Sequence, residues 1–255
     1  MKDVFLSARC TARSVTVFWD KPENAKAAAM YEVSLDGEPI VRTDKTHVTF
    51  AGLSPDTDYA IDVANIGSIH VRTAPVRRRI NVTKPPYNAV GDGHTLNTTA
   101  LQRAFVDCGP NDEVYFPAGV YLTGALDLHS DMAMYLEKDA VLQGSDDPAD
   151  YLPRIWSRFE GVEQECYRSL LNAGHLDRSA GASCENILLY GKGTISGGGR
   201  VLADRMIETE RENLKDYLAQ NAALVATCEN DRTIPGRVRG RLINLSNCAH
   251  VRITG

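Results

Sequence analysis

Residues 91–130, GDGHTLNTTALQRAFVDCGPNDEVYFPAGVYLTGALDLHS, decide the fold of most of the chain. They begin with a glycine-rich turn, continue into a predicted helix over 98–108, and then break into short segments rich in Val, Leu and Tyr. Similar short segments, separated by glycines or polar turns, continue as far as residue 255. An isolated helix ahead of many short strands predicts a repetitive β architecture whose open end the helix covers.

The predicted helix has a polar start and one apolar face. Asn97 is expected to cap it, and Leu101, Ala104 and Phe105 share the face that would be buried. The preceding Gly-Asp-Gly could alternatively cradle a phosphate at the helix N-terminus. Neither a G-x-G-x-x-G pattern nor a Gly-Lys-Ser/Thr triplet is present, so a structural turn is favoured at the two glycines.

Two later segments, SCENILLYG at 183–191 and NCAHVRITG at 247–255, repeat one pattern. Each has a polar residue, a cysteine, and alternating aliphatic residues that end at a glycine. Internal repeats of short strands indicate a solenoid, and crossovers between parallel strands are right-handed as a rule. The sequence therefore predicts an all-β chain with a right-handed parallel β-helix over 91–255. Cys184 and Cys248 would stack on nearby coils as buried free thiols.

The first 75 residues predict a small β-sandwich. Strand-like runs alternate in hydropathy, and Asp36-Gly37 is a hairpin signal between two of them. The stretches FW, YEV and GLSPDTDYAIDV resemble a fibronectin type III module, in which Trp19 would be the core tryptophan and Tyr59 the tyrosine corner. A spacer or docking role is favoured for it over carbohydrate binding. Residues 76–90, rich in proline and arginine, are predicted to be a linker.

Composition argues against several classes of function. A net charge of -5 gives no general attraction to nucleic acid or to anionic membranes, and no apolar run approaches the roughly 20 residues of a membrane span. The six cysteines form no C-x-x-C pair and the six histidines no metal-binding spacing, so neither a metal nor another cofactor is expected. The first residues lack the apolar core of a secretion signal. This predicts a cytoplasmic chain as it stands, or a secreted or periplasmic one if a leader was removed.

Six segments carry a family resemblance: NAVGDGHTLNTTALQRAF, VYFPAGVYLTGAL, MYLEKDAVLQGSDDPADY, RFEGVEQECY, ENILLYGKGTISGGG and RLINLSNCAHVRITG. In this order, over roughly residues 80–255, they resemble the polygalacturonases of glycoside hydrolase family 28. The leading module and the long insertion most resemble the exo-acting branch. The resemblance implies a single-stranded pectin-lyase-like solenoid, and a hydrolase that cleaves α-1,4-galacturonosyl linkages of pectin with inversion.

Inverting hydrolysis needs a carboxylic acid and a carboxylate base about 6.5–9.5 Å apart. The family supplies them in an Asn-Thr-Asp motif and an Asp-Asp pair, together with a Gly-His-Gly histidine and an Arg-x-Lys. Asp146 and Asp147 match a turn of the family and not its catalytic pair, so none of the four motifs is found. No catalytic residue is assigned, and the acids are expected beyond residue 255. The chain alone is expected to be inactive; activity would direct the search to Asp146, Asp147, Glu160 and Glu163.

Arg158 and Glu160 are the candidate substrate-binding residues, because SRFEGVEQECY matches a family loop near the groove. A guanidinium can bind a uronate carboxylate through two parallel hydrogen bonds. A structural Arg158–Glu160 pair that holds the loop is the favoured alternative. In the basic string GRVRGR (Arg237, Arg239 and Arg241), solvation is favoured over contact with an anionic saccharide.

Residues 205–226 predict an amphipathic helix inserted into one coil. Its inward residues would be Ile207, Leu214, Leu218 and Val225. In exo enzymes of the family such insertions close one end of the groove. Packing on the solenoid without a further role is an equal alternative.

The expected partner is pectin or an oligogalacturonide, with neither nucleic acid nor membrane. Two rival functions stay open. One is a noncatalytic saccharide-binding or scaffold β-helix, and the other is a pectate lyase-like enzyme, which would need clustered carboxylates for calcium.

Overall fold

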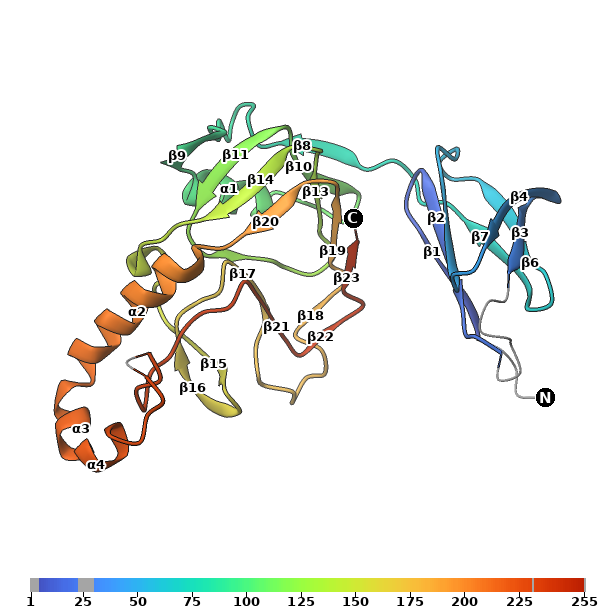
Figure 1. Ribbon diagram of the computed structural model, residues 1–255. Coiled ribbons are helices and arrows are strands. Elements are labelled where there is room, and N and C mark those ends of the chain that lie inside the picture. Colours follow the sequence, from blue (N-terminus) through green and yellow to red (C-terminus); the bar gives the residue numbers. More distant parts are fainter. Residues whose placement is uncertain (1–4, 23–29, 231, 255) are drawn as a thin grey trace. The chain divides into compact units, whose positions relative to one another are not determined.

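The chain divides into two compact units, residues 1–77 and 78–255 (Figure 1). A computed structural model describes residues 5–22, 30–230 and 232–254. The division falls inside the segment 76–90 that we expected to be a linker. Most of that segment belongs to the second unit, and its residues Ile80 and Val82 are buried in the core of that unit.

The first unit is a pair of antiparallel sheets, with strand orders β1-β2-β5 and β4-β3-β6-β7. The strands are β1 (Leu6–Cys10), β2 (Ser14–Trp19), β3 (Tyr31–Leu35), β4 (Glu38–Thr43), β5 (His47–Ala51), β6 (Asp58–Val63) and β7 (Gly67–Arg72). Along β2, buried Val15, Val17 and Trp19 alternate with more exposed residues, as their hydropathy pattern predicts. The Trp19 ring meets Tyr31 edge-on at a centroid distance of 5.3 Å, inside one shared core.

Two local features of this unit agree with the sequence. Asp36 and Gly37 join β3 to β4 with φ angles of 51° and 86°, the positive values that a type I′ hairpin turn requires at both positions. The hydroxyl of Tyr59 accepts a hydrogen bond of 2.9 Å from the Ser54 amide, a few residues upstream. This is the hydrogen bond expected of a tyrosine corner.

The second unit is a right-handed parallel β-helix. One ladder of parallel strands contains β8 (Arg78–Asn81), β10 (Asp112–Phe116), β13 (Ala133–Leu136), β19 (Leu188–Gly191) and β23 (Arg252–Thr254). A second contains β9 (Asp92–Leu96), β11 (Gly119–Thr123), β14 (Ala140–Gly144) and β20 (Thr194–Ser196). A third contains β12 (Leu126–Asp127), β17 (Leu171–Gly174) and β21 (Ile243–Ser246), and β18 (Cys184–Glu185) pairs with β22 (Cys248–Ala249). The strand pattern predicted from sequence is confirmed.

Polar residues and glycines turn the chain between these strands. Asp139, Asn186 and Asn247 have φ angles of 65°, 58° and 52°, in the left-handed region that short polar side chains tolerate. Gly191 has a φ of 119°, and a Cβ atom there would lie 2.1 Å from the carbonyl oxygen of Leu136. Only glycine fits where neighbouring coils approach so closely.

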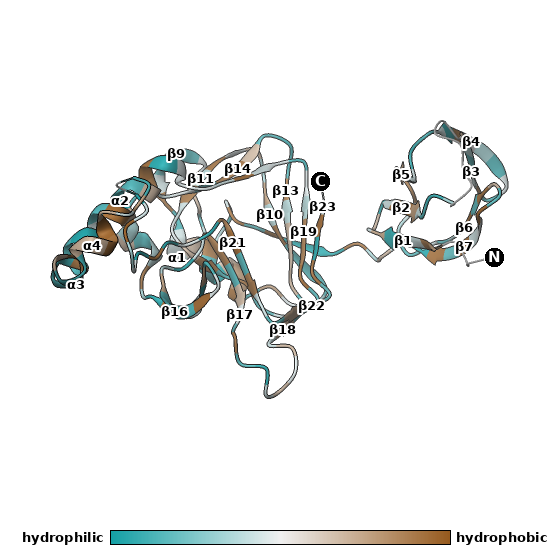
Figure 2. Cartoon of the chain, turned by 60° about the horizontal axis from the view of Figure 1, so that its bottom comes forward, coloured by the Kyte–Doolittle hydropathy of each residue, from teal (hydrophilic) through white to brown (hydrophobic). Residues whose placement is uncertain are grey.

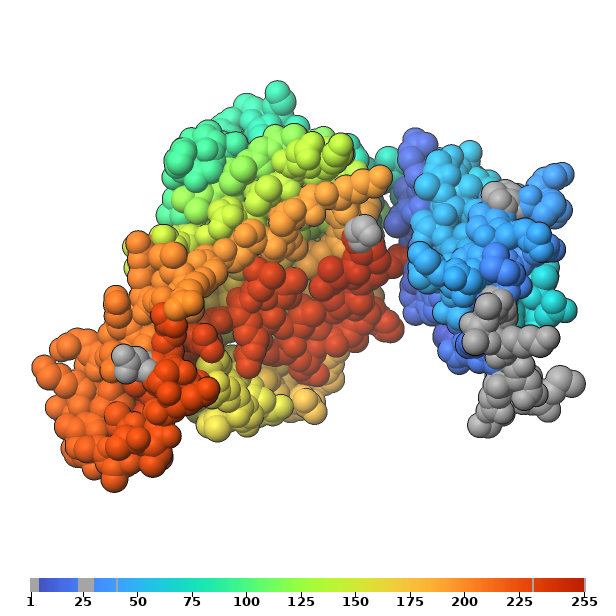
Figure 3. All heavy atoms as spheres, in the orientation of Figure 1, coloured from blue at the N-terminus to red at the C-terminus, as the bar shows by residue number. Residues whose placement is uncertain are grey.

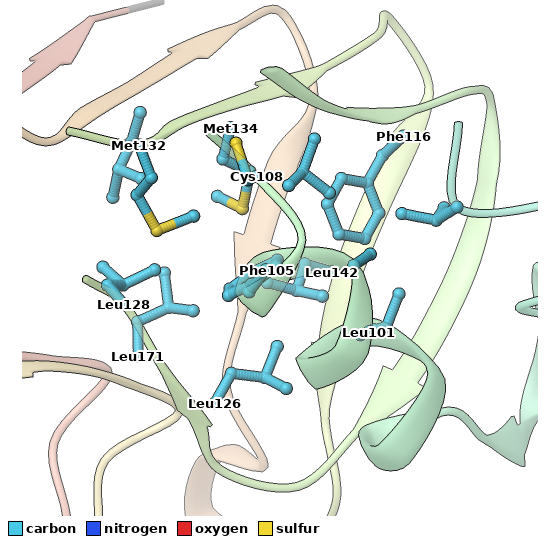
Figure 4. Close-up of a cluster of buried hydrophobic side chains, with 14 of the residues drawn as sticks. Leu101, Phe105, Cys108, Phe116, Leu126, Leu128, Met132, Met134, Leu142 and Leu171 are labelled. Atoms are coloured by element: carbon cyan, nitrogen blue, oxygen red, sulfur yellow. The ribbon is translucent and has the colours of Figure 1, made fainter. Parts of the chain in front are cut away.

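Helix α1 (Thr98–Val106) packs on the β-helix core through the predicted apolar face. Leu101, Ala104 and Phe105 are fully buried. Figure 4 shows Leu101 and Phe105 among core side chains that include Leu126 and Leu142. The helix is therefore the capping helix that the sequence predicted.

The predicted role of Asn97 is only partly right. Asn97 precedes α1 as its N-cap residue, but its side chain makes no capping hydrogen bond. Its amide group instead joins chain segments around the helix start: Oδ1 accepts from the Val90 amide at 2.8 Å, and Nδ2 donates to the Thr95 carbonyl at 2.7 Å. The buried backbone groups of the turn before the helix compete for this side chain and take it.

Cys184 and Cys248 lie opposite each other on paired parallel strands, as free thiols. The first is buried and the second is partly buried. Burial, and then the neighbouring Cys184, raise the pKa of the Cys248 thiol. The predicted stacking of the two thiols is confirmed, and their predicted burial holds fully for Cys184 alone of the pair.

A helical arm occupies the connection from β20 to β21. It consists of α2 (Gly199–Asn213), α3 (Lys215–Gln220) and α4 (Ala222–Val225), where we predicted one helix over 205–226. Only Ile207 of the four predicted inward residues is buried; Leu214, Leu218 and Val225 are half-buried. At the break between α3 and α4, the Asn221 side chain donates to the Tyr217 carbonyl at 2.8 Å, an alternative to continued helix. Figure 2 shows polar and apolar residues mixed along the arm.

The connection from β14 to β17 holds the remaining elements: the 3-10 helix η1 (Pro148–Tyr151) and a hairpin of β15 (Ile155–Phe159) and β16 (Val162–Cys166). Among the described helices, none combines the length and the apolar content needed to cross a bilayer.

Candidate functional site

The predicted substrate-binding residues lie on the β15–β16 hairpin. Arg158 faces Glu163 on the opposite strand, and its Nη2 atom lies 2.6 Å from Glu163 Oε1. Both side chains are about half exposed, at 51% and 46%. Arg158 therefore has a carboxylate partner, Glu163, that was not predicted from the sequence. A guanidinium already paired with one carboxylate is less available to the carboxylate of a substrate.

Glu160 lies in the hairpin turn, with a φ of 48°. Its carboxylate accepts a hydrogen bond of 2.9 Å from Nη2 of Arg237, whose side chain is 14% exposed. The expected alternative, an ion pair between Arg158 and Glu160, is therefore wrong. Arg158 pairs with Glu163, which strand pairing places opposite it, and Glu160 pairs with Arg237. Contact of either residue with a substrate stays a prediction.

Asp146 and Asp147 have structural roles before η1. Asp147 Oδ1 accepts from the Ala149 amide at 2.9 Å and caps the short helix. Asp146 pairs with Arg205 of α2 at 2.6 Å. Both contacts agree with the turn that the sequence indicated. Within the described ranges, no group of three or more His, Cys, Asp or Glu side chains is placed to hold a metal ion.

A cleft of about 440 Å³ opens between the start of α2, the approach to β17 and the loop 237–242. Three arginines line it: Arg168, Arg239 and Arg241. Apolar side chains of Leu170, Leu202 and Met206 supply much of the remaining wall, and the described residues contribute no aspartate or glutamate to the lining. We call this space the arginine cleft. In Figure 3 the red segment that contains loop 237–242 runs between the orange helical arm and the yellow hairpin.

Arg168 is the cleft arginine that sequence reasoning missed. Its side chain is 14% exposed and its Nη2 atom lies 2.5 Å from Asp127 Oδ2, on β12 of the adjacent coil. The only signal in the sequence is an arginine shortly before the buried strand LLNAG. Its contact with a coil about forty residues earlier could not be predicted from local pattern.

Arg239 and Arg241 lie beside Phe159 of the hairpin. The guanidinium carbon of each is 5.8 Å from the centre of the Phe159 ring, within the range of a cation–π contact. Among the described residues, neither guanidinium forms an ion pair with a carboxylate. The favoured expectation, solvation of the basic string, holds in part, because Arg241 is exposed and Arg239 is half-buried. Arg237 is paired, and the other two arginines line a cleft.

The loop that carries these arginines is held by its backbone. The Arg241 amide donates to Ser169 Oγ at 2.8 Å. Gly240 passes so close to the approach to β17 that a Cβ atom would lie 2.2 Å from the Arg168 carbonyl oxygen. The two arginines on either side of Gly240 are therefore displayed from a fixed backbone.

Tyr151 forms a buried part of the cleft wall. Its hydroxyl donates a hydrogen bond of 2.7 Å to the Ser145 carbonyl, and burial raises its pKa far above the usual value. The hydroxyl stays protonated and engaged at neutral pH, so it adds no charge to the cleft. Within the described ranges, the charged side chains of the cleft lining are arginines.

The second unit thus has the fold of the pectin-lyase-like parallel β-helices, and comparisons with known proteins agree. The chain superimposes on a family 28 exopolygalacturonase of Yersinia enterocolitica with a TM-score of 0.78, covering 98% of this chain and 54% of that one at 24% identity. It is 32% identical, over 91% of its length, to an exo-poly-α-D-galacturonosidase of Dickeya chrysanthemi. A probable polygalacturonase of Vitis vinifera is 30% identical over 52% of the chain.

These similarities cover only part of each relative. The chain spans 47% of the Dickeya protein and 28% of the Vitis protein. None of the family models searched matches it.

Proposed function

We propose that the chain is part of a family 28 glycoside hydrolase that cleaves α-1,4-galacturonosyl linkages of pectin, with inversion and from a chain end. The observation that carries the proposal is the 32% identity over 91% of the chain to a protein named exo-poly-α-D-galacturonosidase. The shared β-helix supports it, and so does a cleft in which the charged side chains, among the residues that the structure describes, are all arginines, because the substrate is a polyanion.

The proposal assigns no catalytic residue to these 255 residues. Inversion requires a free acid and a free base about 6.5–9.5 Å apart. Asp146, Asp147, Glu160 and Glu163 are each engaged by an arginine or a backbone amide. Their contacts favour structural roles, and they also support the second candidate, noncatalytic binding of a saccharide by this chain.

The proposal extends to two other parts of the molecule. The first unit would be a fibronectin type III-like spacer or docking module, supported by buried Trp19 and by the Tyr59–Ser54 hydrogen bond. The arm α2–α4 would block one end of the groove. Support for this comes from Leu202 and Met206 of α2, which already wall one side of the arginine cleft.

The test is incubation with polygalacturonate of the 255-residue chain and, where the gene encodes more, of its full product. We expect reducing sugar from the full product, released as single galacturonate units and without an unsaturated product. Unsaturated ends would instead show a lyase. Binding without turnover by every product would leave the saccharide-binding scaffold as the function.

A further inference from the structure

We propose that the arginine cleft binds the carboxylates of an acidic saccharide, and that Arg239 and Arg241 distinguish a free uronate from its methyl ester. Naming the ligand as a galacturonate oligomer rests on the proposed function. The anionic character of the ligand rests on the cleft itself.

Charge balance is the first argument. Most arginines around the cleft have a carboxylate partner: Arg154 pairs with Glu210, Arg158 with Glu163, Arg168 with Asp127 and Arg237 with Glu160. Arg239 and Arg241 have no such partner among the described residues, and no acidic side chain lines the cleft. Two like charges held near one phenyl ring repel each other, and a bound anion would remove that repulsion.

The geometry of the two arginines is the second argument. A guanidinium that rests on an aromatic ring keeps the N–H groups along its edge available for hydrogen bonds. That edge is the part that grips a carboxylate with two parallel hydrogen bonds. The Arg241–Ser169 hydrogen bond and the tight passage at Gly240 fix the loop, so the two side chains start from a defined backbone.

The size and lining of the cleft are the third argument. Its volume of about 440 Å³ lies within the range of roughly 300–1,000 Å³ that is typical of small-ligand sites. Leu170, Leu202 and Met206 make part of the wall apolar. An apolar wall lowers the local dielectric, and this strengthens a carboxylate contact at half-buried Arg239 more than at exposed Arg241. The methyl ester of the same sugar would fit the wall but offer no charge to the arginines.

A purely structural role is the alternative, in which the two arginines only hold Phe159 and the hairpin in place. The experiment therefore measures ligand affinity and thermal stability in parallel. It uses the 255-residue chain, titrated calorimetrically with trigalacturonate and with its methyl ester. The variants are Arg239→Gln, Arg241→Gln, the double variant and Phe159→Leu. The control is Arg42→Gln, because Arg42 forms an exposed pair with Glu32 and does not line the cleft.

We expect trigalacturonate to bind the unmodified chain at least about tenfold more tightly than its ester, since hydrogen bonds to charged groups are the strong ones. Each single glutamine variant should weaken trigalacturonate binding by about tenfold, and the double variant by more. Arg42→Gln should leave the affinity unchanged. Phe159→Leu should lower thermal stability but keep the preference for the free acid, because the charges remain.

Three outcomes would overturn the proposal: no trigalacturonate binding, equal affinity for acid and ester, or unchanged affinity in the double variant. The acid–ester comparison uses the unmodified chain, so its result does not depend on whether a variant folds. Hydrolysis of polygalacturonate with an unchanged KM in the double variant would reject the cleft and keep the proposed function. Binding that requires Arg239 and Arg241, without hydrolysis by any product of the gene, would support the cleft proposal and reject the proposed function.

Discussion

The β15–β16 hairpin and the loop 237–242 both carry arginines, and the loop contacts Phe159 of the hairpin, yet the charges of their arginines are balanced differently. On the hairpin, strand pairing places Glu163 opposite Arg158 and Glu165 opposite Trp156, so the exposed face is balanced by acids. On the loop, Arg239 and Arg241 lie on either side of a glycine, and none of the described strands pairs with it to supply acids. The residue across from an arginine, and not the sequence around it, decides whether its charge is available.

The largest effect is expected at Arg154, which precedes the hairpin. It pairs with Glu210 of α2, whose side chain is 2% exposed, and it stacks 4.5 Å from the ring centre of Tyr167. Arg154→Met would leave a buried carboxylate without its cation and should lower the free energy of unfolding by about 3–5 kcal/mol. Denaturant unfolding measures this loss.

The control is the double variant Arg154→Met with Glu210→Leu, which should recover much of the stability because no charge is left buried. A loss below about 1 kcal/mol for the single variant would show that this pair behaves like an exposed one. Pairing with a carboxylate would then make little difference to what an arginine contributes to stability.

Gly240→Ala tests whether the loop depends on its close approach to the strand beneath it. The added methyl carbon would lie 2.2 Å from the Arg168 carbonyl oxygen, so the loop must shift. We expect a loss of about 1–3 kcal/mol, measured by thermal unfolding. We also expect weaker trigalacturonate binding, although no charge is removed.

The matched change is Gly109→Ala, where the new methyl carbon meets only a carboxylate oxygen of Asp112 at 3.3 Å. It should leave the affinity for trigalacturonate unchanged. Equal behaviour of the two variants would mean that the position of the loop does not matter for binding.

Tyr151→Phe removes a hydroxyl from the wall of the cleft and leaves the Ser145 carbonyl without its donor. At neutral pH the expected loss is about 1 kcal/mol. Because burial raises the pKa of Tyr151 above its unfolded value of about 10, its contribution is complete below pH 10 and is lost as pH rises further. Unfolding measured from pH 8 upward should therefore decline less steeply in the phenylalanine variant. An identical alkaline decline in both proteins would contradict this assignment.

Arg158→Gln should have the smallest effect. The Arg158–Glu163 pair is about half exposed on both sides, and exposed pairs contribute about 0–1 kcal/mol. Chemical unfolding should barely change. Any fall in trigalacturonate affinity should be smaller than that of Arg239→Gln, because Glu163 already holds the Arg158 guanidinium. A fall in affinity as large as that of Arg239→Gln would place the hairpin in the binding site and erase the difference between the two regions.

Much of the fold could be predicted from local patterns. The repeated cysteine segments predicted the pairing of Cys184 with Cys248, and the apolar spacing of α1 predicted its buried face. Errors arose where a polar side chain bonds backbone groups in a way that the hydropathy pattern does not encode. The Asn97 side chain bonds backbone groups outside its helix, and Asn221 interrupts a helix that the apolar spacing extended through it.

The candidate site was less predictable, for a related reason. Arg158 was chosen from its own loop, but its partner is fixed by strand register, which brings Glu163 opposite. Arg168, Arg239 and Arg241 come together only because the coils place the approaches to β17 and β21 side by side. Nothing in the sequence near either segment indicates that contact.

The length of the connection that holds the helical arm α2–α4 determines how much closure entropy it costs the fold. The arm lies in the connection from β20 to β21, which is less than twice as long as the connection from β14 to β17. For a flexible loop, each doubling of length adds only about 0.6 kcal/mol of closure entropy. Material can therefore be added or exchanged at this edge of the solenoid with little penalty to coil stacking. The wall of the cleft could change its shape in this way while the arginines and the coils beneath them stay in place.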